Sequence, residues 1–88
     1  MFTVYVLKSQ SSGKLYIGQT QDLERRIFEH QNGIARYTRN HGPWEVLFTE
    51  EYSTRVEAMR RETFLKSGKG REFIKAKLNG RAGPPEAD

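Results

Sequence analysis

The stretch from Leu15 to Gly33, LYIGQTQDLERRIFEHQNG, decides the fold. It begins with a short apolar segment, passes through a polar turn and continues with the residue spacing of an amphipathic helix. Asp22 is a preferred N-cap residue, and Gly33 after Asn32 is a preferred helix stop, so a helix is predicted from Asp22 to Asn32. The stretch therefore predicts a strand that is followed directly by a helix.

One face of this predicted helix carries two residues that a protein core seldom holds. The stripe at spacing i, i+3, i+4 and i+7, which normally packs on the core, consists of Leu23, Arg26, Ile27 and His30. Burying a guanidinium or an imidazole without partners costs free energy, so these positions need a reason. Arg26 and His30 are therefore candidate functional residues.

Length and composition limit the class of protein. The chain of 88 residues is expected to form one small domain with a single core, and its lack of cysteine excludes disulfides and thiolate metal sites. The N-terminal residues form no apolar run long enough to cross a membrane and show no signal-type charge pattern. These features predict a soluble, cytoplasmic protein without membrane association.

The charge of the chain is basic and unevenly distributed. The net charge is +4, with an isoelectric point near 9.6, and residues 53–78 hold eight Lys or Arg against three Glu. A solvated helical surface and a footprint for a phosphate backbone both agree with this pattern. Charge alone does not decide between them.

Two strands connected by a turn rich in Ser and Gly are predicted before the second half of the chain, at Phe2–Leu7 and Leu15–Gln19. If Leu7 lies opposite Lys14, then Tyr5 lies opposite Tyr16, and both phenols can converge on one site. The alternative is that the two tyrosines simply suit a β-strand.

A third strand and a second helix follow. The third strand is predicted at Trp44–Tyr52, with Trp44, Val46 and Phe48 on one face. Thr54 and Glu57 have the spacing of a capping box, which opens a helix that runs to about Ser67.

The C-terminal part is predicted to end the domain at residue 78. Gly68 and Gly70 are expected to break the helix, and Arg71–Leu78 to form a short final helix. Residues 79–88 lack an apolar anchor and are expected to be a disordered tail. The element order β-β-α-β-α-α predicts a single α/β domain with a small, three-stranded, mainly antiparallel sheet flanked by helices.

Glu62 lies among apolar neighbours on the predicted second helix, near Ala58, Met59 and Leu65. An ion pair with Lys66 at i+4 would explain it as a surface feature. Alternatively, the carboxylate is directed into a site that holds a hard divalent cation, which takes oxygen ligands.

Five residues together supply the groups that phosphodiester hydrolysis needs: proton acceptors, cations for the developing charge and a carboxylate for a metal. They are Tyr5, Tyr16, Arg26, His30 and Glu62. Further candidates for nucleic-acid contact, including a basic loop with one aromatic residue, are Gly18, Arg25, Arg36, Tyr37, Arg39, Lys66, Lys69 and Arg71. Gly18 is expected to allow close approach of the strand end to a phosphate.

Over about residues 2–75 the sequence resembles the GIY-YIG nuclease superfamily, in particular its small stand-alone single-domain members. Tyr16-Ile17-Gly18 matches the second half of the motif, whereas Thr3-Val4-Tyr5 keeps only the tyrosine of the first half. The arginine of the family falls on Arg26, its histidine on His30 and its helical glutamate on Glu62. An asparagine that the family often carries late in the domain has no match here.

The resemblance implies a metal-dependent endonuclease that acts on nucleic acid, with DNA expected, in repair or recombination. Glu62 would ligate Mg²⁺ or Mn²⁺, Arg26 would bind the scissile phosphate, and Tyr16 or Tyr5 would act as general base or orient the attacking water. His30 would position water, share its proton with a tyrosine or act as an acid. Such a small domain leaves room for a protein partner that supplies substrate specificity.

Two other functions stay open from the residues alone. A nucleic-acid-binding module could keep the fold and the basic surface without cutting, and would then show no metal-dependent turnover. A purely structural interaction domain would bind its partner with little dependence on salt, but it explains neither Arg26 nor His30.

Overall fold

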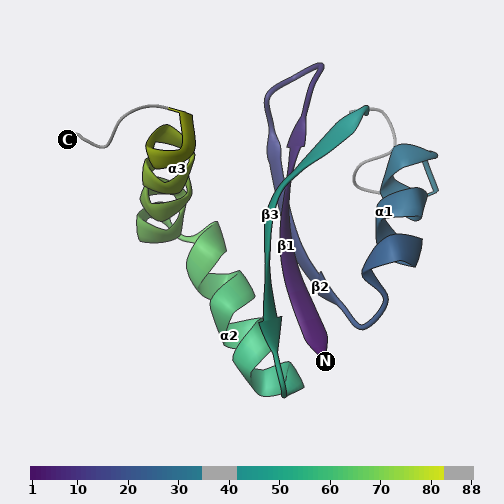
Figure 1. Ribbon diagram of the computed structural model, residues 1–88, viewed down its shortest axis with the longest axis vertical. Coiled ribbons are helices and arrows are strands. Elements are labelled where there is room, and N and C mark those ends of the chain that lie inside the picture. Colours follow the sequence, from purple (N-terminus) through teal and green to yellow (C-terminus); the bar gives the residue numbers. More distant parts are fainter. Residues whose placement is uncertain (35–41, 83–88) are drawn as a thin grey trace.

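The computed structural model describes residues 1–34 and 42–82, with side chains up to residue 78. Three strands and three helices follow in the predicted order β-β-α-β-α-α (Figure 1). Their bounds are β1 Phe2–Ser9, β2 Leu15–Thr20, α1 Leu23–Gln31, β3 Trp44–Tyr52, α2 Arg55–Lys66 and α3 Gly68–Ala82. The predicted α/β class is confirmed.

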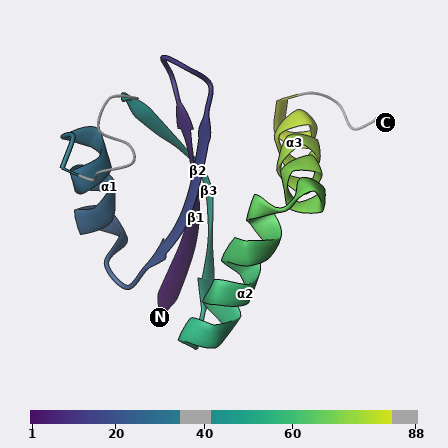
Figure 2. The same cartoon turned by 180° about the vertical axis from the view of Figure 1, so that it is seen from behind.

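The sheet has the order β2-β1-β3, and both pairings are antiparallel. Helix α1 covers one face, whereas α2 and α3 lie on the other (Figures 1 and 2). The central strand β1 is thus covered on both sides, and its residues from Thr3 to Leu7 are all buried. A continuous apolar run such as FTVYVL is typical of a strand in that position.

Two apolar clusters lie on the two faces of the sheet. The larger one packs the sheet against α2 and α3 and consists of Val4, Val6, Ile17, Leu47, Ala58, Leu65 and Ile74. The smaller one lies under α1 and consists of Tyr5, Leu7 and Trp44, with Tyr16, Leu23 and Ile27 packed against it. Successive residues of β1 alternate between the clusters, as the period of two along a strand requires.

The predicted register of the hairpin is wrong by two residues. Leu7 pairs with Tyr16, and Tyr5 pairs with Gly18. The strands are longer than expected because Ser9 closes the turn: its amide donates to the carbonyl of Lys14 at 2.8 Å, and its hydroxyl accepts from Ser12. A slip of two residues keeps every side chain on its face, so both tyrosines still lie on the α1 side.

Strand β3 departs from strict alternation at a bulge. Val6 pairs with Phe48 and Leu7 with Val46, so Leu47 is an additional residue in this strand. Trp44 therefore packs under α1, Phe48 packs with the cluster on the other face, and Val46 is exposed. The predicted common face for these three residues is wrong, because it assumed an uninterrupted period of two.

The side chain of Gln31, at the end of α1, forms hydrogen bonds with the backbone at the start of β3. Its amide oxygen accepts from the backbone N–H of Trp44 at 2.8 Å, and its amide nitrogen donates to the Trp44 carbonyl. Both backbone groups of this strand residue are thereby satisfied by one side chain of the helix.

The junction between α2 and α3 lies at Ser67, and the prediction that Gly68 and Gly70 break the helix is wrong. Ser67 has an extended backbone, and its hydroxyl accepts from the amide of Gly70, as an N-cap does for a new helix. Both glycines are helical. A Cβ on Gly70 would lie 2.0 Å from the Phe64 carbonyl oxygen, so glycine here permits close packing of α2 and α3.

Helix α3 continues beyond the predicted end of the domain. Its backbone runs to Ala82, past Leu78, and residues 83–88 lie outside the described part. Ile74 and Leu78 anchor the helix on the core, and each further residue then adds one hydrogen bond at low cost. Across the described ranges, no helix has the length and apolar character needed to cross a membrane.

Candidate active site

Helix α1 holds its two unusual residues against the sheet. Asp22 caps the helix by accepting from the amide of Arg25 at 3.1 Å, as predicted, and Gly33 after its end has a positive φ of 72°. Leu23 and Ile27 anchor the helix on the smaller cluster. The same face then directs Arg26 and His30 toward β1 and β2.

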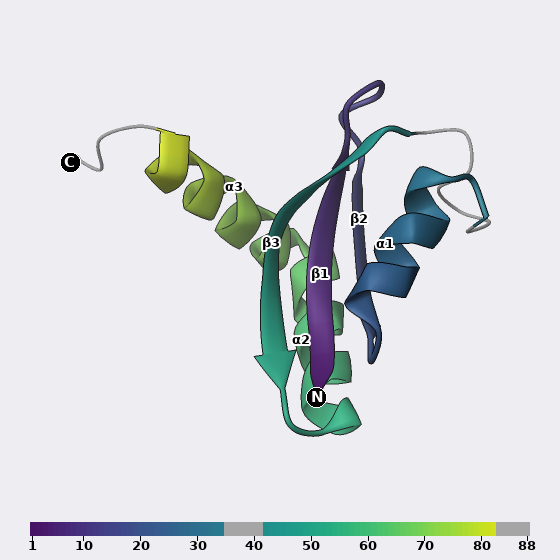
Figure 3. The same cartoon turned by 45° about the vertical axis from the view of Figure 1, so that its right-hand side comes forward.

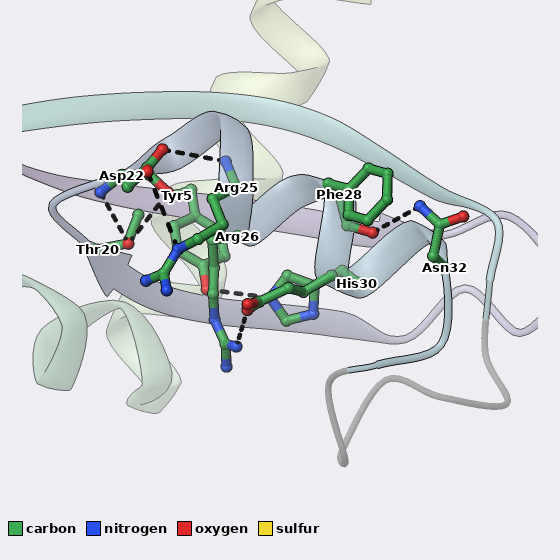
Figure 4. Close-up of polar contacts among 9 residues, drawn as sticks. Tyr5, Thr20, Asp22, Arg25, Arg26, Phe28, His30 and Asn32 are labelled. Carbon is green, nitrogen blue, oxygen red and sulfur yellow. Dashed lines mark hydrogen bonds and ion pairs between the residues drawn. The ribbon is translucent and has the colours of Figure 1, made fainter.

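Tyr5, Tyr16 and His30 form one group between the sheet and α1. The hydroxyl of Tyr5 lies 3.1 Å from Nε2 of His30, an interaction drawn in Figure 4. The ring of Tyr16 lies 4.7 Å from the ring of His30 and 6.1 Å from that of Tyr5, centroid to centroid. Tyr5 and His30 are 1% exposed, whereas Tyr16 is half-buried.

Burial keeps both partners of the Tyr5–His30 hydrogen bond uncharged. Desolvation raises the pKa of Tyr5 to about 12, although the nearby Arg26 opposes this shift. Desolvation, reinforced by the charge of Arg26, lowers the pKa of His30 to about 4. At neutral pH the bond therefore joins a phenol and a neutral imidazole.

Arg26 lies beside these rings, and the carboxylate of Glu29 offsets part of its positive charge. Its Nη1 contacts the carboxylate of Glu29 at 2.7 Å, and its side chain is 33% exposed. The pair with Glu29, followed by the neighbouring phenols of Tyr5 and Tyr16, raises the pKa of the guanidinium further above its usual range. Arg26 is thus a permanent cation next to both tyrosines. Sequence reasoning did not single out Glu29, although its i+3 spacing from Arg26 is a recognisable signal.

The structure explains the glycine at position 18 by the packing of the two tyrosines. A Cβ at this position would lie 2.7 Å from the Tyr5 hydroxyl and 3.1 Å from the ring of Tyr16. The space above the glycine is therefore filled by the tyrosines rather than left open for a phosphate. Gly18 lets the two phenols approach each other.

A polar pocket next to Arg26 brings three arginines together. Arg25, Arg26 and Arg55 line it, with Asp22 as its acidic member. The guanidinium of Arg55 lies over the ring of Phe2, 5.4 Å from its centroid, which holds α2 near the start of β1. In the sequence Arg55 is one member of the basic stretch 53–78, and its place beside Arg25 and Arg26 depends on the tertiary fold.

Glu62 lies on α2, which covers the sheet face opposite to α1, with edge strand β2 between the two helices (Figure 3). Its carboxylate pairs with Lys66 at 2.7 Å. Lys66 and Tyr16 line one groove along the β2 edge, together with Leu15, Ile17 and Arg71. The four residues Tyr5, Tyr16, Arg26 and His30 therefore form one cluster. Glu62 lies apart from it, and only its partner Lys66 lines the groove that Tyr16 also lines.

The residues present fit a metal that is mostly held by water. Among the described residues, no group of three His, Cys, Asp or Glu side chains could enclose an ion. Mg²⁺ commonly keeps several waters and binds through one or two carboxylates together with substrate phosphates. Glu62, with 21% of its side chain exposed, can supply one such carboxylate.

The remaining predicted binding residues fall in two places. Lys66, Lys69 and Arg71 are exposed on α2 and α3. Arg36, Tyr37 and Arg39 lie outside the described residues.

The His30→Gln variant is expected to change the pH dependence of stability. Between about pH 6.5 and 4, the unfolded chain gains a proton on His30 that the folded chain excludes, so stability falls as pH falls. The pKa difference corresponds to roughly 3 kcal/mol. We expect the difference in the free energy of unfolding between wild type and variant to shrink by about this amount from pH 7 to 4. Urea titrations at several pH values measure it; parallel pH profiles would contradict the neutral, buried His30.

Comparison with known proteins agrees with the residues assembled above. A sequence model described as the GIY-YIG catalytic domain matches residues 1–79. A UPF0213 protein of Halobacterium salinarum is 43% identical over 67 residues, which cover 75% of this chain and 86% of that protein. One from Clostridium perfringens is 42% identical over 64 residues, covering 72% and 68%.

A solved structure extends this similarity to the fold. The solution NMR structure of a UPF0213 protein from Bacillus halodurans superposes with a TM-score of 0.55 at 38% sequence identity. The match covers 96% of this chain and 89% of the other. Sequence and fold thus point to the same group of small domains.

Proposed function

The chain belongs to the GIY-YIG family, and we propose that it is a divalent-metal-dependent endonuclease that hydrolyses phosphodiester bonds in DNA, in repair or recombination. The observation that carries this proposal is the convergence of Tyr5, Tyr16, Arg26 and His30 between α1 and the β1–β2 hairpin. A plain core would not collect a guanidinium, an imidazole and two phenols at one place.

Tyr16 is the better candidate for the residue that orients or deprotonates the attacking water. It is half-buried and lines the groove along the β2 edge, whereas Tyr5 is 1% exposed and has a raised pKa. Tyr5 and His30 then act as positioning residues, because their hydrogen bond fixes the rings that border Tyr16. Arg26 lies beside both phenols and can hold the phosphate next to the water that Tyr16 orients.

Arg26 and Glu62 would complete the chemistry. Arg26 can offer guanidinium N–H groups to the scissile phosphate, where negative charge grows in the transition state. Glu62 would hold Mg²⁺ or Mn²⁺, and a bound metal supplies positive charge for the phosphate oxygens. Lys66 would have to release the Glu62 carboxylate, at least in part, for this role.

The second candidate is a nucleic-acid-binding module that does not cut. One observation favours it: the carboxylate of Glu62 is engaged by Lys66, on a helix that covers the opposite face of the sheet from α1. In that case the metal would have no dedicated ligand, and the basic surface alone would serve binding.

Cleavage of a panel of labelled substrates tests the proposal, with single-stranded, duplex, flapped and branched DNA and RNA, in Mg²⁺ or Mn²⁺. Losing a metal ligand removes several kcal/mol of transition-state stabilisation, so Glu62→Ala should cut at least about 100-fold more slowly. Its affinity for the same substrates, measured in EDTA, should stay unchanged. Glu72→Ala is the matched control, because it removes an exposed glutamate from α3. Salt-sensitive binding without products on any substrate would favour the non-cutting module.

A further inference from the structure

A second groove lies between the β1–β2 hairpin and α3, whose positions are visible in Figures 1 and 2. Its volume is about 570 Å³. It is lined by Lys8, Gly13, Lys14, Leu15, Arg71, Ile74, Lys75 and Leu78. We call it the hairpin–α3 groove.

The hairpin–α3 groove is uniformly cationic. Lys8, Lys14, Arg71 and Lys75 all line it, and its described lining includes no acidic residue. Within the described ranges, none of these four cations takes part in an ion pair. Four cations around one concave surface raise the local concentration of anions, and Glu45, which pairs with Lys8 across β1 and β3, offsets part of this charge beside the lining.

The apolar lining of the groove suits the stems of these basic side chains. Leu15, Ile74 and Leu78 line it between the cations, and Ile74 is 1% exposed. Lysine and arginine keep their charged ends in water while their methylene groups cover such a surface. Among the residues that the structure describes, the lining includes no aromatic ring for base stacking and no side-chain amide for base recognition. This chemistry suits phosphates and not bases.

The groove continues toward the candidate active site. Leu15 and Arg71 also line the groove along the β2 edge, in which Tyr16 and Lys66 lie. A phosphate backbone bound along the cations of the hairpin–α3 groove would therefore extend to the edge of β2, where Tyr16 is accessible. A single small anion would not need this continuity.

We propose that the hairpin–α3 groove binds the phosphate backbone of the nucleic-acid substrate on one side of the scissile bond, which rests on the proposed function. Lys14 and Lys75, on opposite walls, clamp the backbone, and Arg71 carries it toward Tyr16. Binding here is independent of base sequence and depends strongly on salt.

Binding of a labelled DNA duplex in EDTA, measured by fluorescence anisotropy over a range of salt concentrations, tests the groove. Lys14→Ala with Lys75→Ala should lower the slope of log affinity against log salt by about two and weaken binding roughly 50-fold near 0.1 M salt. Lys75→Ala alone should lower the slope by about one. The matched control is Arg60→Ala, which removes one exposed charge from α2, outside both grooves. It should leave slope and affinity unchanged.

The outcomes separate the groove from the proposed nuclease. A double variant with the wild-type slope and affinity overturns the groove, even if the wild type cleaves DNA. Loss of binding in the double variant without cleavage by the wild type overturns the nuclease and leaves the groove standing. Free nucleotides that compete as well as the duplex, at equal phosphate concentration, would assign the groove to a small anion and overturn the backbone proposal. Lys14 and Lys75 are exposed, so the thermal melting of the variants should match that of the wild type.

Discussion

Alanine in place of Arg26 is expected to slow metal-dependent cleavage by roughly 100- to 1,000-fold, the cost of removing one preorganised donor from a developing anion. The guanidinium lies beside Tyr5 and Tyr16, so its removal takes away the proposed phosphate contact next to the residue that would orient the water. The loss should appear mainly in kcat, because the proposed interaction strengthens in the transition state. Single-turnover cleavage assays measure it.

Two further variants separate the charge of Arg26 from its geometry and catalysis from substrate binding. Arg26→Lys keeps the charge but loses the two-pronged donor geometry, so it should recover only part of the rate. Arg25→Ala removes the neighbouring exposed arginine, which pairs with Asp22, and should weaken substrate binding while sparing kcat. If Arg26→Ala cleaves within about tenfold of the wild type, a difference of only ~1.4 kcal/mol, Arg26 does not act on the scissile phosphate.

The substitution Gly70→Ala is expected to destabilise the fold by about 3 kcal/mol or more, because overpacking against backbone cannot be relieved by a side-chain movement. The new Cβ would lie 2.0 Å from the carbonyl oxygen of Phe64 and 2.4 Å from the Cα of Leu65, so α2 and α3 would have to separate. For a domain of this size the melting temperature should fall by roughly 12 °C or more. Thermal and urea unfolding measure the effect.

Gly68 provides the matched control in the same helix. Apart from its chain neighbours and the adjoining backbone of α3, no described atom lies within 4 Å of a Cβ built on Gly68. Alanine there should be neutral or stabilising by up to about 1 kcal/mol, because it reduces the freedom of the unfolded chain. Equal melting temperatures for the two variants would show that α2 and α3 do not need the close approach at Gly70.

The sequence predicts the elements of this fold well because their ends carry explicit signals. Asp22, Gly33 and Thr54 mark the limits of α1 and the start of α2 as expected. The hairpin register and the bulge at Leu47 were missed because both depend on how three strands fit together, and no local pattern marks them. The sequence suggests a helix breaker at Gly70, whereas the folded chain uses its missing side chain to bring the backbone of α2 close.

In the candidate site, too, contacts between neighbouring elements are predictable and contacts that depend on tertiary packing are not. The family resemblance places Tyr16, Arg26 and His30 in one site, and the structure brings their side chains together because a strand and the helix after it stay close in space. The relation of Glu62 to this cluster depends on how α2 packs across the sheet, which spacing does not define. Lys14 and Lys75 carry no sequence signal of a shared site, because the hairpin and α3 face each other only in the folded chain.

The hydrogen bonds between Gln31 and Trp44 join the end of α1 to the start of β3 through one side chain. The place of β3 in the sheet is therefore coupled to the place of α1, the helix that carries Arg26 and His30. A displacement of the sheet edge at Trp44 would thus be transmitted to the helix of the candidate site, although Trp44 has no part in the proposed chemistry.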